Sequence, residues 1–166
     1  MIHAILDAAR MGSAMATAKE LTDEHSSLYK GESMEKLADF APYLFMVSGQ
    51  SAFTTWVTAQ GWGDSWGIYL ESSANPADLY HHFRKFLLVR TEAGKELYFR
   101  FYDPRVLRQF LPTSDAYQLT AFFGPVRYFL LEDADPDFAV RYWLEARTLR
   151  QQRLTRAEAE QLIRSC

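Results

Sequence analysis

The sequence has almost no cysteine, and this absence excludes two kinds of site. Its one cysteine, Cys166, is the last of 166 residues, so neither an intramolecular disulfide nor a cluster of cysteine metal ligands can form. Long apolar runs are missing as well. The longest, Ala41 to Val47, is far shorter than the roughly 20 residues that cross a bilayer. No basic cluster opens the chain, and Asp7 interrupts the early apolar stretch. We therefore expect no secretory signal, no membrane partner and a cytoplasmic location.

A dominant charge is also lacking. The chain carries 18 Lys and Arg residues against 21 Asp and Glu residues, a formal net charge of −3, whereas a phosphate-binding surface needs clustered Lys and Arg. Arginines do gather near the C-terminal end, but they alternate with acidic residues at helical spacing, which indicates a solvated helix face. We therefore expect no nucleic-acid partner.

Short apolar segments alternate along the chain with patterns typical of helices. The first apolar segment is ambiguous, because so short a run also fits the start of a helix that continues to Leu21. Strands are predicted at Ile2–Ala9, Ala41–Val47, Trp66–Leu70 and Val126–Leu131, and a hairpin at Leu87–Thr91 and Glu96–Tyr102. Helix starts are predicted at Ser51, Asn75-Pro76, Asp103-Pro104, Asp135-Pro136 and Thr155.

This order of elements predicts an α/β fold. Strands that alternate with helices favour a mostly parallel mixed sheet flanked by helices, here with one antiparallel hairpin and C-terminal helices. The first strands are apolar with little alternation, which is typical of a sheet covered on both faces. We expect residues 1–135 to form the core domain and residues 136–166 a helical extension packed on or beside it.

A serine after a predicted strand invites comparison with a hydrolase. Gly49-Gln50-Ser51-Ala52-Phe53 resembles the nucleophile elbow of an α/β hydrolase, but Phe53 stands where that elbow needs its second glycine. The pattern favours Ser51 as a helix cap. The glycines of residues 61–67 leave a helix and enter a strand, the reverse of a phosphate-binding loop.

Metal and cofactor patterns are incomplete. Asp133 and the aspartates that follow it imitate the start of a calcium loop, but Phe138 and Leu144 occupy the positions that need Gly and Glu. The adjacent His81 and His82 lack the i, i+4 spacing of a helical metal pair. We expect no metal and no cofactor. Carboxylates at strand ends leave open a small-molecule sensor with a cleft at that edge.

One stretch is more specific than any of these patterns. Phe99 to Leu107 reads FRFYDPRVL, and Phe122 to Val126 reads FFGPV. Together they resemble the hallmark of a bacterial family first catalogued as a domain of unknown function, the type VI secretion effector adaptors, or effector chaperones of the Tap or TEC type. Further matching segments are HAILDAA (residues 3–9), APYL (41–44), WGIYL (66–70) and HHFRKFLLV (81–89).

The resemblance spans about residues 2–131 and favours the strand interpretation of Ile2–Ala9. It implies a non-enzymatic loading factor that holds a toxic effector and helps to mount it on the VgrG spike. Its implied partners are therefore an effector protein and VgrG. The alternatives are a small α/β hydrolase with Ser51 as nucleophile and the small-molecule sensor.

An adaptor needs exposed side chains that can be buried against partners, and aromatic residues and arginine are enriched in such contacts. We expect the partner-binding side chains to be Trp62, Tyr98, Tyr102, Arg105, Tyr117 and Tyr142. The signature residues are instead expected to be structural: Asp103 caps a helix, Pro104 fixes its first turn, and Arg100 or Arg105 pairs with a carboxylate such as Asp7. The remaining signature residues are Gly124 and Pro125.

Overall fold

The computed structural model describes residues 1–31 and 37–165, so Cys166 lies outside the described residues. A sheet of seven strands runs through the molecule in the order β2-β3-β1-β4-β7-β8-β9, and a separate two-stranded sheet contains β5 and β6. The strands of the large sheet are β1 (Ile2–Asp7), β2 (His25–Ser27), β3 (Pro42–Val47), β4 (Gly67–Ser72), β7 (Val126–Glu132), β8 (Phe138–Glu145) and β9 (Thr148–Thr155).

Every neighbouring pair in this sheet is antiparallel, so the prediction of a mostly parallel sheet was wrong. The reason lies in the place of β1. Strands β3 and β4 both run antiparallel to β1 and lie on either side of it. They are therefore parallel to each other, but β1 lies between them, and the helix that connects them passes over β1. Alternation of strands and helices was therefore real, but it did not give parallel pairing.

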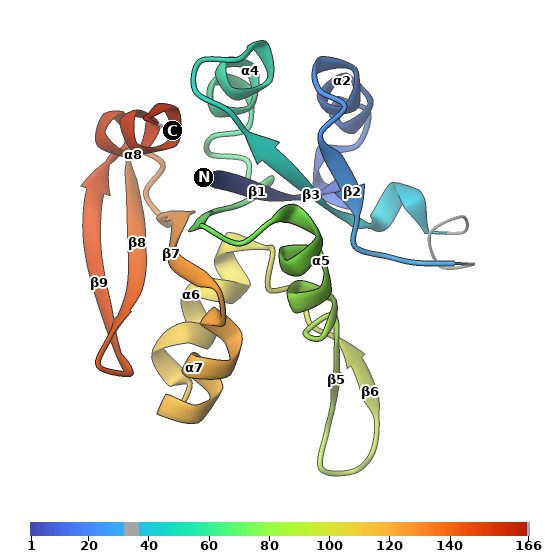
Figure 1. The fold of residues 1–166 in the computed structure, drawn as a ribbon, viewed down its shortest axis with the longest axis vertical. Coiled ribbons are helices and arrows are strands. Elements are labelled where there is room, and N and C mark those ends of the chain that lie inside the picture. The colour runs from blue at the N-terminus through green and yellow to red at the C-terminus, as the bar shows by residue number, and fades with distance from the viewer. Residues whose placement is uncertain (32–36, 166) are drawn as a thin grey trace.

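Helices cover both faces of the sheet (Figure 1). The helices of one face are α1 (Ala8–Met11), α2 (Ala14–Leu21), α4 (Ala52–Gln60) and α8 (Arg156–Arg164). Those of the other face are α5 (Pro76–Arg84), α6 (Pro104–Thr113) and α7 (Ala116–Phe123), and a short 3-10 helix, η1, spans Ala38–Phe40. Phe45 stacks on Phe53 in the first core, with 4.9 Å between ring centroids, and Phe122 stacks on Phe129 in the second, at 5.3 Å.

Local structure confirms most of the predicted helix starts and the predicted strands, except that the strand expected over Glu96–Tyr102 ends at Tyr98. Ser51, Asn75 and Asp103 each accept a hydrogen bond from a backbone N–H in the first turn of their helix. The capping box at Thr155 is also present, since Thr155 and Glu158 cap each other's backbone N–H groups. Among the described residues, no helix is both long and apolar enough to cross a membrane.

The C-terminal region departs from the prediction, because residues 138–155 form a hairpin and not helices. After Asp135-Pro136 the chain makes a turn, in which the Phe138 N–H donates to the Asp135 carbonyl at 3.0 Å. Strands β8 and β9 then pair from Phe138 opposite Thr155 to Glu145 opposite Thr148. They extend the large sheet beside β7, and α8 is the one helix that follows them in the described chain.

The glycine-rich turn of residues 61–67 is fastened to the end of β7 by a buried carboxylate. Glu132 is only 6% exposed, and Ser65 donates its backbone N–H to the Glu132 Oε2 at 3.2 Å. Burial raises the pKa of Glu132 from 4.5 to about 7, against the lowering effect of hydrogen bonds from the Ser65 and Gly63 N–H groups. Gly67 itself has no room for a side chain, because a Cβ there would lie 2.1 Å from the Ile5 carbonyl oxygen.

The raised pKa makes Glu132 a source of pH-dependent stability. The folded state binds its proton more tightly than the unfolded state, so this contribution is complete below pH 4.5 and is lost as the pH rises towards 7. The Glu132→Gln variant cannot lose this proton. As the pH rises from 4.5 to 8, we therefore expect its unfolding free energy to increase by about 3 kcal/mol relative to that of the unsubstituted protein. Urea unfolding across this range measures the difference. Glu145→Gln, at an exposed position, is the control, and a difference independent of pH would contradict the assignment.

Candidate protein-binding site

The β5–β6 hairpin carries the most concentrated exposed apolar surface in the described chain. Strands β5 (Leu88–Arg90) and β6 (Glu96–Tyr98) form a ribbon that projects from the body of the molecule (Figure 1). Its apolar side chains are exposed, from 41% at Val89 to 58% at Tyr98. Within the described residues, neither strand pairs with a third strand.

Both faces of this ribbon present an apolar pair. Leu88 lies opposite Tyr98, and Val89 lies opposite Leu97, and successive positions in a strand point to opposite faces. A lone two-stranded hairpin is marginally stable in water, and grouped exposed apolar side chains mark surfaces that contact other molecules. The hairpin therefore has the properties of a docking arm.

The FRFYDPRVL signature fixes the base of this arm to the core. Strand β6 ends at Tyr98, and the Phe99 N–H still donates to the Leu87 carbonyl at 2.9 Å. The Phe99 ring then packs on Phe110 at 4.7 Å between centroids, and the Phe101 ring stacks on Phe83 at 5.5 Å. The alternate aromatic residues of the signature thus belong to the second core.

Arg100, between these rings, pairs with the carboxylate of Asp7. Asp7 ends β1, its side chain is 1% exposed, and it caps α1 by accepting from the Ala9 N–H at 3.0 Å. Arg100 remains 44% exposed and donates to the second Asp7 oxygen. The predicted ion pair with Asp7 is confirmed for Arg100. It offsets the cost of burying an unpaired charge.

Asp103 and Arg105 form a second charged pair. Arg105 donates from its backbone N–H at 2.9 Å and from its guanidinium at 3.0 and 2.6 Å to the two Asp103 oxygens. Burial opposes ionisation of Asp103, but the hydrogen bonds and charge of Arg105 outweigh it, so the pKa of Asp103 lies below its ordinary 3.8. Pro104 is the first residue of α6, as predicted.

The Gly124-Pro125 step holds the other part of the signature. Gly124 ends α7 with a φ of 47°, and a Cβ there would lie 2.3 Å from the His82 ring. That ring bonds the Phe122 carbonyl oxygen at 2.8 Å, and Ser72 Oγ donates to the Pro125 carbonyl at 2.8 Å. Glycine is needed here for both its backbone conformation and the close approach of His82.

Five aromatic residues were expected to be exposed for partner binding, and two of them are. Tyr98 is 58% and Tyr117 83% exposed, and the Arg105 side chain is 50% exposed. Exposure was wrongly predicted for Trp62, Tyr102 and Tyr142, all of which are buried.

Each of the buried three is held by its surroundings. The Trp62 Nε1–H donates to the Pro136 carbonyl at 2.9 Å. Tyr102 hydrogen-bonds the side chain of Tyr29, and burial raises its pKa. Tyr142 packs in the second core.

Sequence reasoning predicted the hairpin but did not name Leu88, Val89 and Leu97 as partner-binding residues, although all three are exposed. Their exposure follows from the short strands of the structure, since two strands of three residues cannot cover both of their own faces.

The residues of the alternative functions lie apart. Ser51 Oγ accepts from the Thr54 N–H at 3.1 Å and lies 2.9 Å from Thr54 Oγ1, and none of its hydrogen bonds in the described chain is to a histidine. His82 instead bonds Phe122. No group of three or more His, Cys, Asp or Glu side chains suited to a metal ion occurs among residues 1–31 and 37–165.

The capping role of Asp103 is open to measurement. Asp103→Ala removes both the helix cap and the acceptor of Arg105, so we expect the unfolding free energy to fall by about 1–2 kcal/mol. Asp103→Asn keeps a capping oxygen and should lose less, and the advantage of Asp over Asn should fade as the pH falls below 3.8. Urea unfolding compares the variants. An unchanged midpoint in Asp103→Ala would indicate that the motif serves recognition instead.

Comparison with known proteins adds a family to this geometry. The family model described as Domain of unknown function (DUF4123) matches residues 2–121. It includes the hairpin and both charged pairs, and it ends before Gly124-Pro125. No curated protein and no solved structure matches the chain. Because the match covers well over half of its residues, the chain belongs to the DUF4123 family, which is associated with effector chaperones of type VI secretion systems.

Proposed function

We propose that this protein is a cytoplasmic adaptor that binds a type VI secretion effector and promotes its loading onto the VgrG spike, without a catalytic step of its own. The observation that carries the proposal is the exposed hairpin, held on the core by the signature of the family. Membership of DUF4123 supports the class of function.

The chemistry of the hairpin suits the binding of a protein. Its two apolar pairs, Leu88 with Tyr98 and Val89 with Leu97, are half exposed and lose water on contact with a partner. Its open strand edges offer backbone N–H and C=O groups to a strand of that partner. The Arg90–Glu96 pair near the tip is exposed and contributes little by itself.

The base of the hairpin restricts its motion before binding. The ion pair of Arg100 with Asp7 and the packing of Phe99 on Phe110 fix the residues that leave β6. An arm that is already positioned loses less conformational entropy when it docks, and this favours affinity. Tyr117 on α7 and Arg105, both exposed, are further candidates for contact with the partner.

Co-purification tests the proposal. The tagged protein is co-expressed with the effector and VgrG encoded beside it, and retention of each is measured. We expect Val89→Ser/Leu97→Ser to reduce effector retention by about tenfold or more, since buried apolar anchors dominate such interfaces. Its thermal stability should change little, because both side chains are exposed.

Phe40→Ser is the matched control, because Phe40 is 60% exposed and belongs to η1, outside the hairpin. It should retain the effector as the unsubstituted protein does. The proposal fails if the unsubstituted protein retains neither effector nor VgrG. If Phe40→Ser and the hairpin variant lose binding equally, the hairpin is not the docking arm.

A further inference from the structure

A second surface lies between α8 and strands β7 and β8, on the other face of the large sheet from α5, α6 and α7. Helix α8 packs through Ala159 and Ile163 over Ala139 and Leu154, at one end of the β8–β9 hairpin. Further along this hairpin, towards its turn, a cavity of about 540 Å³ opens beside Tyr128, Arg141 and Trp143. A cavity of about 320 Å³ adjoins it, and Glu71 and Arg127 line both. We call the surface that lines these two cavities the groove.

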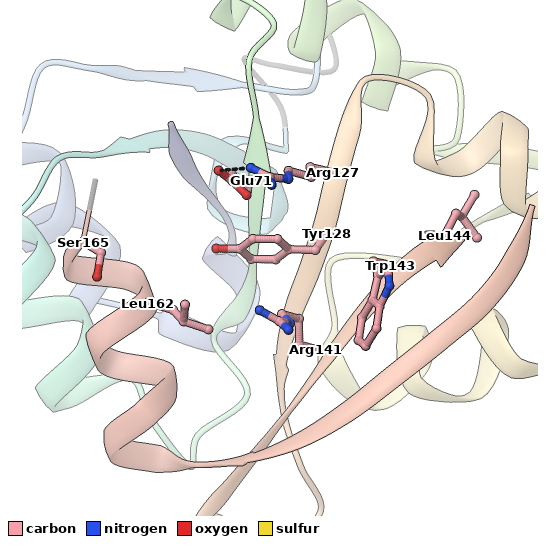
Figure 2. Close-up of a pocket in the computed structure, with 8 residues that line it drawn as sticks. All are labelled: Glu71, Arg127, Tyr128, Arg141, Trp143, Leu144, Leu162 and Ser165. Carbon is pink, nitrogen blue, oxygen red and sulfur yellow. Dashed lines mark hydrogen bonds and ion pairs between the residues drawn. The ribbon is translucent and has the colours of Figure 1, made fainter. Parts of the chain in front are cut away.

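Arginine and aromatic rings dominate the larger cavity (Figure 2). The Arg141 guanidinium lies 5.7 Å from the centroid of the Tyr128 ring and 5.2 Å from that of Trp143. It also donates to Gln152 Oε1 at 2.7 Å. Figure 2 shows Tyr128 and Arg141 projecting from the sheet towards Leu162 of α8. The rings and Gln152 thus hold the charge of Arg141 in a fixed position at the cavity.

The second arginine of the groove, Arg127, is more available to a partner. Arg127 is 80% exposed, and its Nη1 lies 3.4 Å from Glu71 Oε1. Exposed pairs of this kind contribute little, so a carboxylate from a partner can take the place of Glu71 or share the guanidinium with it. The groove therefore offers two guanidinium groups against one carboxylate, in a chain whose net charge is −3.

We propose that this groove binds an extended acidic segment of a partner polypeptide, with carboxylates on Arg127 and Arg141 and an aromatic side chain against Trp143. Guanidinium groups form strong, charge-assisted hydrogen bonds with carboxylates. Two arginines on a chain of negative net charge are too few for a nucleic acid. This inference rests on the proposed function in one respect, namely that the ligand of the groove is a polypeptide.

A direct binding measurement tests it. The probe is a fluorescein-labelled decapeptide of alternating Glu and Tyr, measured by anisotropy with the full chain. We expect binding that weakens as salt is raised, and a loss of affinity of about tenfold or more in Arg127→Gln and in Arg141→Gln. Arg90→Gln on the distant hairpin is the control, because Arg90 is similarly exposed, and it should bind as the unsubstituted protein does.

Nuclear magnetic resonance of the four tryptophan indole N–H groups locates the site. The Trp143 signal should shift with added peptide, while that of Trp62, which donates to Pro136, should not. Absence of binding, insensitivity to either arginine variant, or equal binding of a Lys-Tyr decapeptide or of an oligothymidylate would overturn the inference. Failure of effector co-purification with peptide binding intact would count against the proposed function alone.

Discussion

The carboxylate of Asp7 is buried at the end of the central strand β1, and the nearby charge of Arg100 offsets much of the cost of that burial. The same carboxylate caps α1, so one side chain joins the middle of the sheet, the first helix and the base of the exposed hairpin. Loss of Arg100 would leave a charge without its partner in the interior. The position of the hairpin therefore depends on the integrity of β1.

The residues of the FRFYDPRVL signature have different structural roles. Phe99, Phe101 and Tyr102 pack in the second core, whereas Arg100 pairs with Asp7. Asp103 then begins α6 at once. Nine residues thus leave an exposed hairpin, cross the core and enter a helix, with polar groups satisfied at each step. Because this short segment joins the hairpin to the core, the motif can be structural and still determine where a partner docks.

Interactions between residues close in sequence were predictable. Of those between distant residues, the Arg100–Asp7 ion pair was predicted, but the pairing of the strands was not. The caps at Ser51, Asn75 and Asp103 follow from local hydrogen bonding, and all were predicted. Asp135-Pro136 has the same pattern but is followed by strands. The turn of that hairpin, Ala146-Arg147, has positive φ values of 47° and 64° at residues that do not usually adopt them. The residues of this turn therefore gave no sequence signal for a hairpin, and the pairing of β8 with β9 and with β7 was not predicted.

The candidate site was predictable in its charges but not in its apolar contacts. Composition favoured aromatic side chains as the exposed ones, yet Trp62, Tyr102 and Tyr142 are buried, because each also has a polar group that finds a partner or packs in the core. Leu88, Val89 and Leu97 are ordinary core residues by type and are exposed because their hairpin lies outside both cores. Topology decided this exposure, because the two three-residue strands form a sheet of their own, apart from the large sheet.

The two proposed surfaces differ in chemistry and in their relation to the family. The hairpin is apolar and lies within the matched residues 2–121, whereas the groove is charged and both of its arginines, Arg127 and Arg141, lie beyond the match. An adaptor must bind a common component and also select its own cargo, and selection requires contacts that penalise the wrong partner. Buried apolar area supplies affinity with little discrimination, while paired charges discriminate strongly. On this argument the groove, rather than the hairpin, is the surface on which specificity for one partner would depend.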